Sequence, residues 1–160
     1  MTLVIRPVRP GEAGLVLGFI QALADYEKLS HEVVATEERL AAELFAAAPR
    51  VFCEIAELDG VPVGFALWFY NYSTFVGRCG IYLEDLFVLP QARGAGAGKA
   101  LLQGLARRCV AEGLGRLEWS VLDWNAPAIG FYDSLGADAM DGWTIRRLHG
   151  DALQALGAAE

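Results

Sequence analysis

Two neighbouring motifs in the sequence have residue types that could do chemistry. The segment 93–99, RGAGAGK, places three alternating glycines between an arginine and a lysine. It follows an apolar run that carries two acids, Glu84 and Asp85. Glycine lets backbone N–H groups approach a phosphate closely, and a following helix adds partial positive charge. A carboxylate can attract a cation or accept its proton. Together the motifs could hold an anion beside a group that handles protons.

The glycine spacing excludes two common phosphate motifs. A dinucleotide fingerprint needs glycine at its first, third and sixth positions, and starting from Gly94 or Gly96 the sixth position is not glycine. A P-loop needs glycine where Arg93 stands and Ser or Thr after Lys99, where an alanine stands. The remaining R-x-x-G-x-G spacing suits a pyrophosphate held by backbone amides. A glycine-rich turn without a ligand is the alternative, although glycines in a first helical turn are destabilising.

The two acids need separate explanations if they lie in a regular strand. Side chains alternate along a strand, so Glu84 and Asp85 are expected on opposite faces, with Glu84 on the face of Tyr82, Leu86 and Val88. An alkyl ammonium has a pKa near 10.4, and releasing the neutral amine at pH 7 costs roughly 4.6 kcal/mol. Glu84 could supply the base that helps this step. The alternative for Glu84 is a salt bridge to Arg78 or Arg93, and Asp85 is expected to be structural, for instance by holding loop backbone.

The periodicity of the chain predicts a mixed α/β fold that positions these motifs. Strands are expected at 2–8, 79–90, 115–124 and 143–148, and a hairpin over 51–72 turns at Asp59–Gly60. The run 79–90 is too apolar for a one-sided strand, so it is expected to be central. Helices are expected at 12–26, 36–47 with Thr36 as N-cap, 97–113 ending at Gly113, 125–136 with Asn125 as N-cap, and near the C-terminus.

Composition narrows the class of protein further. The 160 residues suit one domain, and 54% apolar residues argue against disorder. No run of about 18 uncharged apolar residues predicts a membrane span. Three cysteines without CxxC spacing and two histidines favour reduced thiols and no zinc site. The net charge of −7 disfavours nucleic acid and favours a cationic substrate by steering, although it also serves solubility. The N-terminus does not resemble a signal peptide, so a cytoplasmic protein is expected.

The ordered set of motifs resembles the GCN5-related N-acetyltransferase (GNAT) family. The glycine segment resembles its acyl-CoA pyrophosphate loop, Q/R-x-x-G-x-G/A. The chain is most similar to the spermidine/spermine acetyltransferase branch, and within it to thialysine acetyltransferase-like members. The motifs are YEKLS (26–30), YLEDLFV (82–88), RGAGAGKALL (93–102), VLDWN (121–125), FY (131–132), GA (136–137) and GW (142–143). They span most of the chain, from Ile5 to Leu148, in order.

The resemblance implies a fold, a reaction and residue roles. The fold is a single GNAT domain over 1–160, with a mixed, mostly antiparallel sheet of about six to seven strands and about four to five helices. The reaction transfers acetyl from acetyl-CoA to a small cationic amine, with no metal. Glu84 is the implied base, and Tyr132 protonates the departing thiolate. Cofactor contacts are implied for Leu86, Phe87, Val88, Arg93, Gly94, Ala95, Gly96, Ala97, Gly98, Lys99, Asn125, Pro127, Ala128 and Tyr132. Substrate contacts are implied for Tyr26, Glu27, Glu84, Glu118, Trp119 and Ser120.

Several implied roles have alternatives. Asn125 could simply cap its helix, and taken alone Tyr132 and Phe131 are an ordinary aromatic pair on a helix. Polyamine-specific members carry an aspartate in the loop that is here 71–77, NYSTFVG, which has no acid. A shorter acceptor, such as a lysine analogue or a diamine, is therefore expected. Acetylation of a protein amine, or CoA sensing without turnover, are the alternative functions. The family is commonly dimeric, and Trp68, Tyr70, Tyr72 and Phe75 are interface candidates, although core burial would also explain Trp68.

Overall fold

The computed structural model describes residues 1–159. The chain forms two compact units, Met1–Ser120 and Val121–Glu160, and each is described by itself. The first unit carries both motifs, the glycine segment and the two acids of the apolar strand.

The first unit is built on a five-stranded sheet with the order β1-β2-β3-β4-β5. Strands β1 to β4 pair antiparallel, and β5 pairs parallel to β4. Strands β3 and β4 are long and lie inside the sheet. The central position predicted for the apolar run 79–90 is therefore confirmed for β4. The strands are β1 (Leu3–Pro7), β2 (Phe52–Leu58), β3 (Val61–Ser73), β4 (Arg78–Val88) and β5 (Leu117–Trp119).

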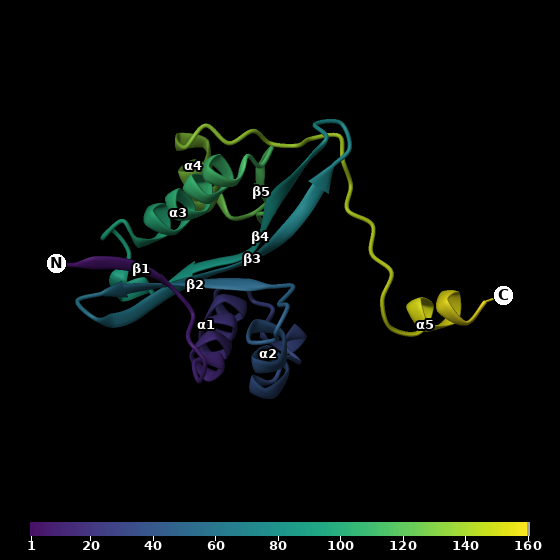
Figure 1. The fold of residues 1–160 in the computed structure, drawn as a ribbon, viewed down its shortest axis with the longest axis horizontal. Helices are drawn as coiled ribbons and strands as arrows, with labels where there is room; N and C mark the ends of the chain where they lie inside the picture. The colour runs from purple at the N-terminus through teal and green to yellow at the C-terminus, as the bar shows by residue number, and fades with distance from the viewer. Residues whose placement is uncertain (160) are drawn as a thin grey trace. The chain divides into compact units, whose positions relative to one another are not determined.

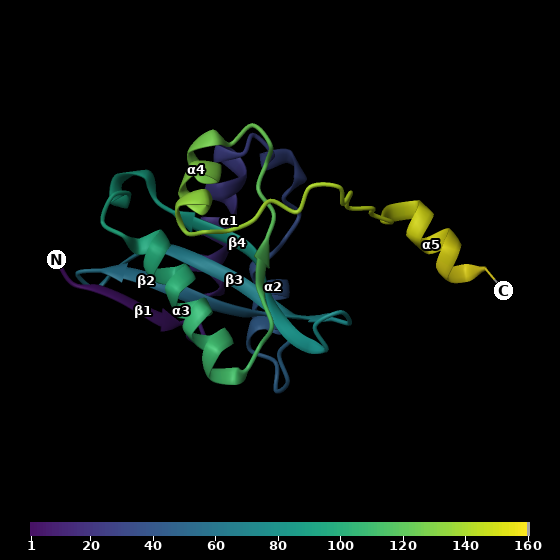
Figure 2. The ribbon, with the colours of Figure 1, turned by 90° about the horizontal axis from the view of Figure 1, so that it is seen from above.

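Helices cover both faces of this sheet (Figures 1 and 2). Helices α1 (Ala13–Tyr26) and α2 (Glu37–Leu44) lie on one face, and α3 (Ala97–Glu112) lies on the other. Short 3₁₀ turns occupy Ser30–Glu32 and Pro90–Ala92. The core between the sheet and helices α1 and α2 is formed by apolar side chains from both layers. In it, Phe19 stacks on Phe65 with ring centroids 5.6 Å apart. This packing fixes α1 over β3 and β4, and so fixes where α1 ends.

The second unit contains two helices. Helix α4 (Ala126–Ser134) begins at the N-cap Asn125, whose Oδ1 accepts a hydrogen bond from the Ala128 N–H at 3.4 Å. Helix α5 (Gly150–Ala158) follows a segment without regular structure. The predicted strand 143–148 is wrong. Its alternating pattern suits an extended chain, but a strand also needs a hydrogen-bonding neighbour, and residues 121–159 contain no other strand.

The α/β class and most predicted elements are confirmed. The hairpin turns at Asp59 and Gly60, both with positive φ, and the Thr36 hydroxyl caps α2 through the Arg39 N–H at 3.3 Å. Helix α3 ends at Gly113, which has φ +67°. The described sheet has five strands, so six to seven was only an approximate expectation, and the predicted strand 115–124 is reduced to the three residues of β5.

Candidate active site

A β-bulge in β4 sets the geometry around the two acids. Leu83 lies opposite Trp68, and Asp85 lies opposite the next residue, Leu67, so Glu84 is an extra residue without a partner in β3. A bulge interrupts the alternation of side chains and re-aims them. The expectation that Glu84 and Asp85 must leave opposite faces of a regular strand therefore does not apply.

The bulge also corrects the expected grouping of side chains along β4. Tyr82 lies opposite Phe69, whereas Leu86 lies opposite Ala66. Because Phe69 and Ala66 are three residues apart in β3, they point to opposite faces. Tyr82 and Leu86 are therefore not on one face, and the sequence pattern misplaced one of them because it assumed an unbroken strand.

Three carboxyl groups interact around the bulge. Asp85 lies on the face covered by α1, since its cross-strand neighbour Leu67 belongs to the core under that helix. Burial first, and then the negative charges of Glu84 and Glu27, raise the pKa of Asp85 from 3.8 to about 6. Burial also raises the pKa of Glu27, the residue that caps the C-terminus of α1. This arrangement is a negatively charged environment that would favour a bound cation.

The alternative explanations for the two acids find no support. Within residues 1–159, Glu84 forms no ion pair with Arg78 or Arg93, and Asp85 forms no hydrogen bond to loop backbone. The electrostatic interaction of Asp85 with Glu84 was missed from the sequence, where only the rarity of two adjacent acids in an apolar strand could have indicated it.

The glycine segment forms a loop that ends at the N-terminus of α3. Gly94 and Gly96 have φ of +87° and +84°, and a Cβ at either position would meet nothing within 4 Å. Gly96 is the N-cap of α3 and offers no side-chain acceptor, in contrast to Thr36 in α2. The N–H groups of the first turn, which includes Ala97, Gly98 and Lys99, therefore lack a side-chain cap. The loop fits a pyrophosphate in conformation and in open space.

The backbone of β4 beyond the bulge is accessible to a ligand on the side away from β3. Strand β5 pairs with β4 only from Ile81 to Leu83. The Val88 carbonyl accepts a hydrogen bond from Arg93, so the polar groups of Val88 point away from β3, and by alternation those of Leu86 do too. Phe87 is 5% exposed and packs in the core, so it would offer backbone rather than side chain.

Arg93 connects the glycine loop to the end of α1. Its Cζ lies 5.0 Å from the centroid of the Tyr26 ring and 5.8 Å from that of Phe87. Its Nε donates to the Val88 carbonyl at 3.2 Å. The structure thus brings together predicted site residues from two separate parts of the sequence, because Arg93 contacts Tyr26, the neighbour of Glu27.

The predicted substrate residues of β5 already have partners in the first unit. Glu118 lies 2.9 Å from the Nε of Arg116 and accepts a hydrogen bond from Asn71 at 3.0 Å. The Ser120 and Tyr82 hydroxyls are 2.7 Å apart. A cationic substrate at Glu118 would have to compete with Arg116 for the carboxylate. The hydroxyls of Tyr82 and Ser120 could instead form hydrogen bonds to a polar group of the substrate. Trp119, which lies between Glu118 and Ser120 in the sequence, is half-buried.

The remaining predicted residues lie in the second unit. Asn125 is 7% exposed and caps α4, and Pro127 lies in the first turn with Ala128. Tyr132 is half-buried in α4, with its ring tilted against Phe131 at 5.6 Å between centroids. The capping role of Asn125 is confirmed, and the other roles of these residues stay predictions.

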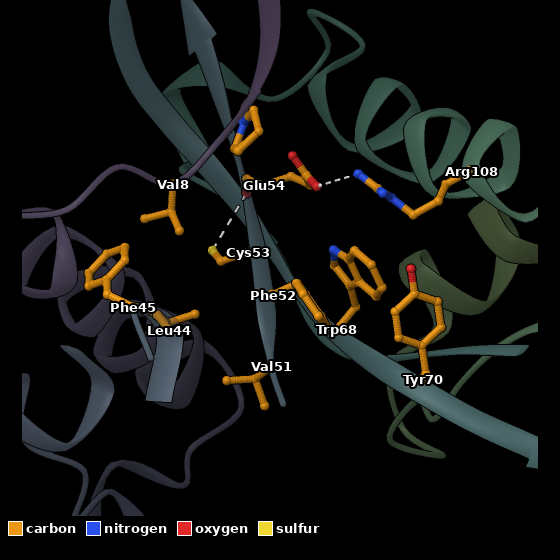
Figure 3. Close-up of a pocket in the computed structure, with 11 residues that line it drawn as sticks. Val8, Leu44, Phe45, Val51, Phe52, Cys53, Glu54, Trp68, Tyr70 and Arg108 are labelled. Carbon is orange, nitrogen blue, oxygen red and sulfur yellow. Dashed lines mark hydrogen bonds and ion pairs between the residues drawn. The ribbon is translucent and has the colours of Figure 1, made fainter. Parts of the chain in front are cut away.

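A separate pocket of about 200 Å³ lies in the first unit (Figure 3). None of the predicted site residues lines it, within the part of the chain that the structure describes. The chain's own cation occupies its polar end, because Arg108 lies 5.1 Å from the Trp68 ring and 3.6 Å from Glu54. Trp68 is only 1% exposed, so it is a core residue and not an interface candidate.

Comparisons with known proteins show what the chain is similar to. The model of the Acetyltransferase (GNAT) family matches residues 16–137. A thialysine N-epsilon-acetyltransferase from Bos taurus is 38% identical, with 95% of each chain covered. The L-ornithine N5-acetyltransferase NATA1 from Arabidopsis thaliana is 33% identical over 95% of this chain and 86% of its own. The solved structure of the integron cassette protein VCH_CASS6 from V. cholerae has a TM-score of 0.81, 27% identity and 99% coverage of both chains.

The chain belongs to the GNAT acetyltransferase family. It is an acetyl-transferring enzyme, and the family uses acetyl-CoA as co-substrate. Its similar relatives are named for amine acceptors, thialysine and L-ornithine. No helix among residues 1–159 is both long enough and apolar enough to cross a membrane.

Proposed function

We propose that the protein transfers the acetyl group of acetyl-CoA to a primary amine of a small cationic substrate, by direct attack within a ternary complex. The acceptor class is a diamine, a polyamine or a lysine-like amino acid such as thialysine. One observation carries the proposal: Glu84, Asp85 and Glu27 gather at a bulge in the strand that leads into the glycine loop. The relatives named for thialysine and ornithine support the same acceptor class.

Within that class, a short acceptor fits best. The segment 71–77 contains no carboxylate that could pair with a distant second ammonium. The polar residues at its centre are Ser73 and Thr74. Ser73 is 5% exposed, and its hydroxyl is engaged by the Val76 N–H at 3.2 Å. A second cationic group is instead expected to interact with Glu27, close to Asp85. We therefore expect lysine-like acids and short diamines to react better than spermine.

The residues that would hold acetyl-CoA follow from the loop and from β4. Backbone groups of Leu86, Phe87 and Val88 run beside the pantetheine arm, and the loop from Gly94 to Lys99 holds the pyrophosphate. Asn125, Pro127 and Ala128 provide contacts from α4. When bound, acetyl-CoA supplies an activated thioester, and an N–H of Leu86 or Val88 polarises its carbonyl.

Two side chains handle the protons. The ammonium of the acceptor loses a proton to Glu84, directly or through water, and the neutral nitrogen then attacks the carbonyl carbon. The C–N bond forms, the nitrogen releases its second proton to solvent, the C–S bond breaks, and Tyr132 donates its phenolic proton to the departing sulfur. The products are the N-acetyl amine and CoA, and the proton on Glu84 later restores Tyr132 through solvent.

The test is acetyl-CoA-dependent thiol release with a panel of thialysine, lysine, ornithine, short diamines and spermine. Glu84→Gln and Tyr132→Phe should each lower kcat by about 10²-fold or more, the usual contribution of a proton-transfer group. Glu38→Gln and Tyr72→Phe, exposed residues of α2 and β3, are matched controls that should keep wild-type rates. Unchanged turnover in both test variants would overturn the assigned roles.

The same assay separates the alternative functions. Acetylation of lysate proteins without turnover of any free amine would show a protein acetyltransferase instead. Tight CoA binding with no acetylation of either would show a sensor.

We further propose that the whole chain is one acetyltransferase domain that acts as a cytoplasmic homodimer without metal, nucleic acid or membrane. The family match from 16 to 137 spans the boundary between the two units, which supports a single domain. Exposed apolar side chains in the second unit, including Trp143 and Ile145 at 75% each, support association with a second copy.

A further inference from the structure

The contact between Arg93 and Tyr26 joins the two halves of the proposed site. Arg93 opens the glycine loop, and Tyr26 is the last residue of α1. We propose that Arg93 is a positioning residue that couples acyl-donor binding at the loop to amine binding at the end of α1. This inference rests on the proposed function, because it assigns one substrate to each side of the contact.

The geometry gives Arg93 three partners within the first unit. Its guanidinium lies against the Tyr26 and Phe87 rings, 5.0 and 5.8 Å from their centroids, and its Nε donates to the Val88 carbonyl at 3.2 Å. Phe87 is buried in the core, so it is a rigid support. Tyr26 is more exposed, at 37%. Arg93 therefore holds Tyr26 against a fixed strand from the loop side.

The position of Tyr26 determines the position of Glu27. The helix ends here, where Lys28 adopts a φ of +61° and the Leu29 N–H returns to the Ala24 carbonyl at 2.8 Å. The C-terminal turn is thus tightly defined, and a shift of Tyr26 shifts Glu27 with it. The negative charge of Glu27 in turn raises the pKa of Asp85. The contact of Arg93 with Tyr26 can therefore affect the proposed amine site through a single residue, Glu27.

Ligand binding at the loop would strengthen this contact. Cation–π pairs are weak when exposed and stronger when water is excluded. Arg93 is exposed and directly precedes the loop, so we expect a ligand seated on Gly94 to Lys99 to exclude water from part of its side chain. Coupling between two binding events is reciprocal, so the amine should also tighten binding of the acyl donor. An exposed pair of this kind corresponds to about a two- to fivefold change in affinity.

A direct contact of the Arg93 side chain with phosphate is the alternative, and it makes a different prediction. A phosphate ligand acts on CoA affinity whatever residue stands at 26. If Arg93 is a coupling residue, it acts through the ring of Tyr26. Removing that ring should then weaken CoA binding, although Tyr26 lies outside the loop.

The experiment is a double-mutant cycle on CoA affinity, measured by calorimetry without amine. Tyr26→Leu should weaken CoA binding about two- to fivefold, while the matched control Tyr26→Phe, which keeps the ring, should not. Arg93→Met should weaken it at least as much, and the double variant should be no weaker than Arg93→Met alone. Arg93→Lys should rescue only in part, since an ammonium lacks the planar stacking surface.

Steady-state kinetics gives the second readout. Raising acetyl-CoA to saturation should lower the KM of the amine in the wild type, and Tyr26→Leu and Arg93→Met should lose this dependence of KM on acetyl-CoA. Thermal unfolding of each variant excludes a folding defect. The inference fails if Tyr26→Leu binds CoA like the wild type, or if the two single effects simply add. Failure of the proposed function would look different, because no amine would then be acetylated while CoA affinity could still respond to residue 26.

Discussion

Asp85 carries the most perturbed carboxyl of the proposed amine site. It lies beside Glu84 and under α1, and no cation pairs with it in the described part of the chain. Burial first, and then the charges of Glu84 and Glu27, raise its pKa to about 6. An ionised carboxylate in this position is destabilising, and a bound ammonium would relieve that cost. Under the proposed function, Asp85 lowers the stability of the free protein and favours the binding of a cation.

Asp85→Asn should therefore stabilise the free protein at neutral pH. A carboxyl whose folded pKa is raised contributes most to stability below its ordinary value of 3.8, and this contribution is lost as the pH rises through about 6. The amide removes the penalty, so the free energy of unfolding should rise by about 2–3 kcal/mol at pH 7.5. The gain should shrink as the pH falls toward 5. Urea unfolding at both pH values measures it.

Asp138→Asn is the matched control, since Asp138 is an exposed carboxylate. It should change stability by less than about 0.5 kcal/mol at either pH. If Asp85→Asn were instead destabilising to the same extent at both pH values, Asp85 would be a hydrogen-bonded structural residue, as the sequence had suggested.

At the scale of elements, a buried ion triad secures the start of the sheet. Arg6 in β1 is 9% exposed, and its Nη2 lies 2.7 Å from Glu12 and 2.6 Å from Glu57. It therefore ties β1 to β2 and to the residue before α1. The hydrogen bond from Arg6 is the main cause that lowers the pKa of Glu12.

Arg6→Met should lower the free energy of unfolding by roughly 3–5 kcal/mol, because it leaves two carboxylates without their buried partner. The pH dependence has the opposite sign to that of Asp85. With its pKa lowered, Glu12 stabilises above its ordinary value of 4.5, and this contribution is lost as the pH falls through the lowered pKa. Chemical denaturation between pH 3 and 7 checks both points. Arg50→Met, which replaces an exposed arginine that does not act on Glu12, should leave the profile unchanged.

The loop before α3 allows the role of its glycines in folding to be separated from their role in binding. Gly96 has a φ of +84°, so Gly96→Ala is strained and should destabilise by about 1 kcal/mol or more. Gly98 is helical, and an added Cβ would have only Val88 Cγ2 within 4 Å, at 3.8 Å. Gly98→Ala should therefore keep or raise stability by up to about 1 kcal/mol.

The test of ligand approach is the KM for acetyl-CoA in Gly98→Ala. If a pyrophosphate comes close to the first turn, the added methyl group should raise this KM at least several-fold in a fully stable protein. Gly104→Ala, a glycine further along α3, is the control for helix propensity. A Gly98→Ala variant with wild-type KM would show that the phosphate contacts lie elsewhere.

Local rules predict the elements whose signals lie within a few residues. Asp59–Gly60 supplies the positive φ that the hairpin requires, and Thr36 supplies the cap that begins α2. The bulge at Glu84 has no such local signal, because it depends on how β4 registers against β3. The same limit explains 143–148, where the pattern predicts an extended chain but cannot provide a neighbouring strand. Within the site, the loop was predictable from its glycines, whereas the interaction of Asp85 with Glu84 and Glu27 was not.

At the scale of the whole molecule, the second unit exposes many apolar side chains without a chemical role. Met140, Trp143, Ile145, Leu153 and Leu156 are each at least 50% exposed. Single exposed apolar residues are ordinary, but such a run over 140–156 is typical of a surface that is covered in an assembly. A second copy is the simplest cover, because the same surface is then used twice with closed symmetry.

Sedimentation should therefore give a mass twice the 17.3 kDa of one chain, and Trp143→Glu should shift the protein toward monomer. Because Trp143 is 75% exposed, the substitution removes little intrachain packing, so a loss of assembly reports the interface itself. Val110→Glu is the matched control, an 84% exposed apolar residue on α3 that should leave the dimer intact. A wild-type monomer at micromolar concentration would exclude the homodimer. A Trp143→Glu dimer as tight as the wild type would place the interface elsewhere, with Tyr72 and Phe75 at the tip of the β3–β4 hairpin as the next positions to substitute.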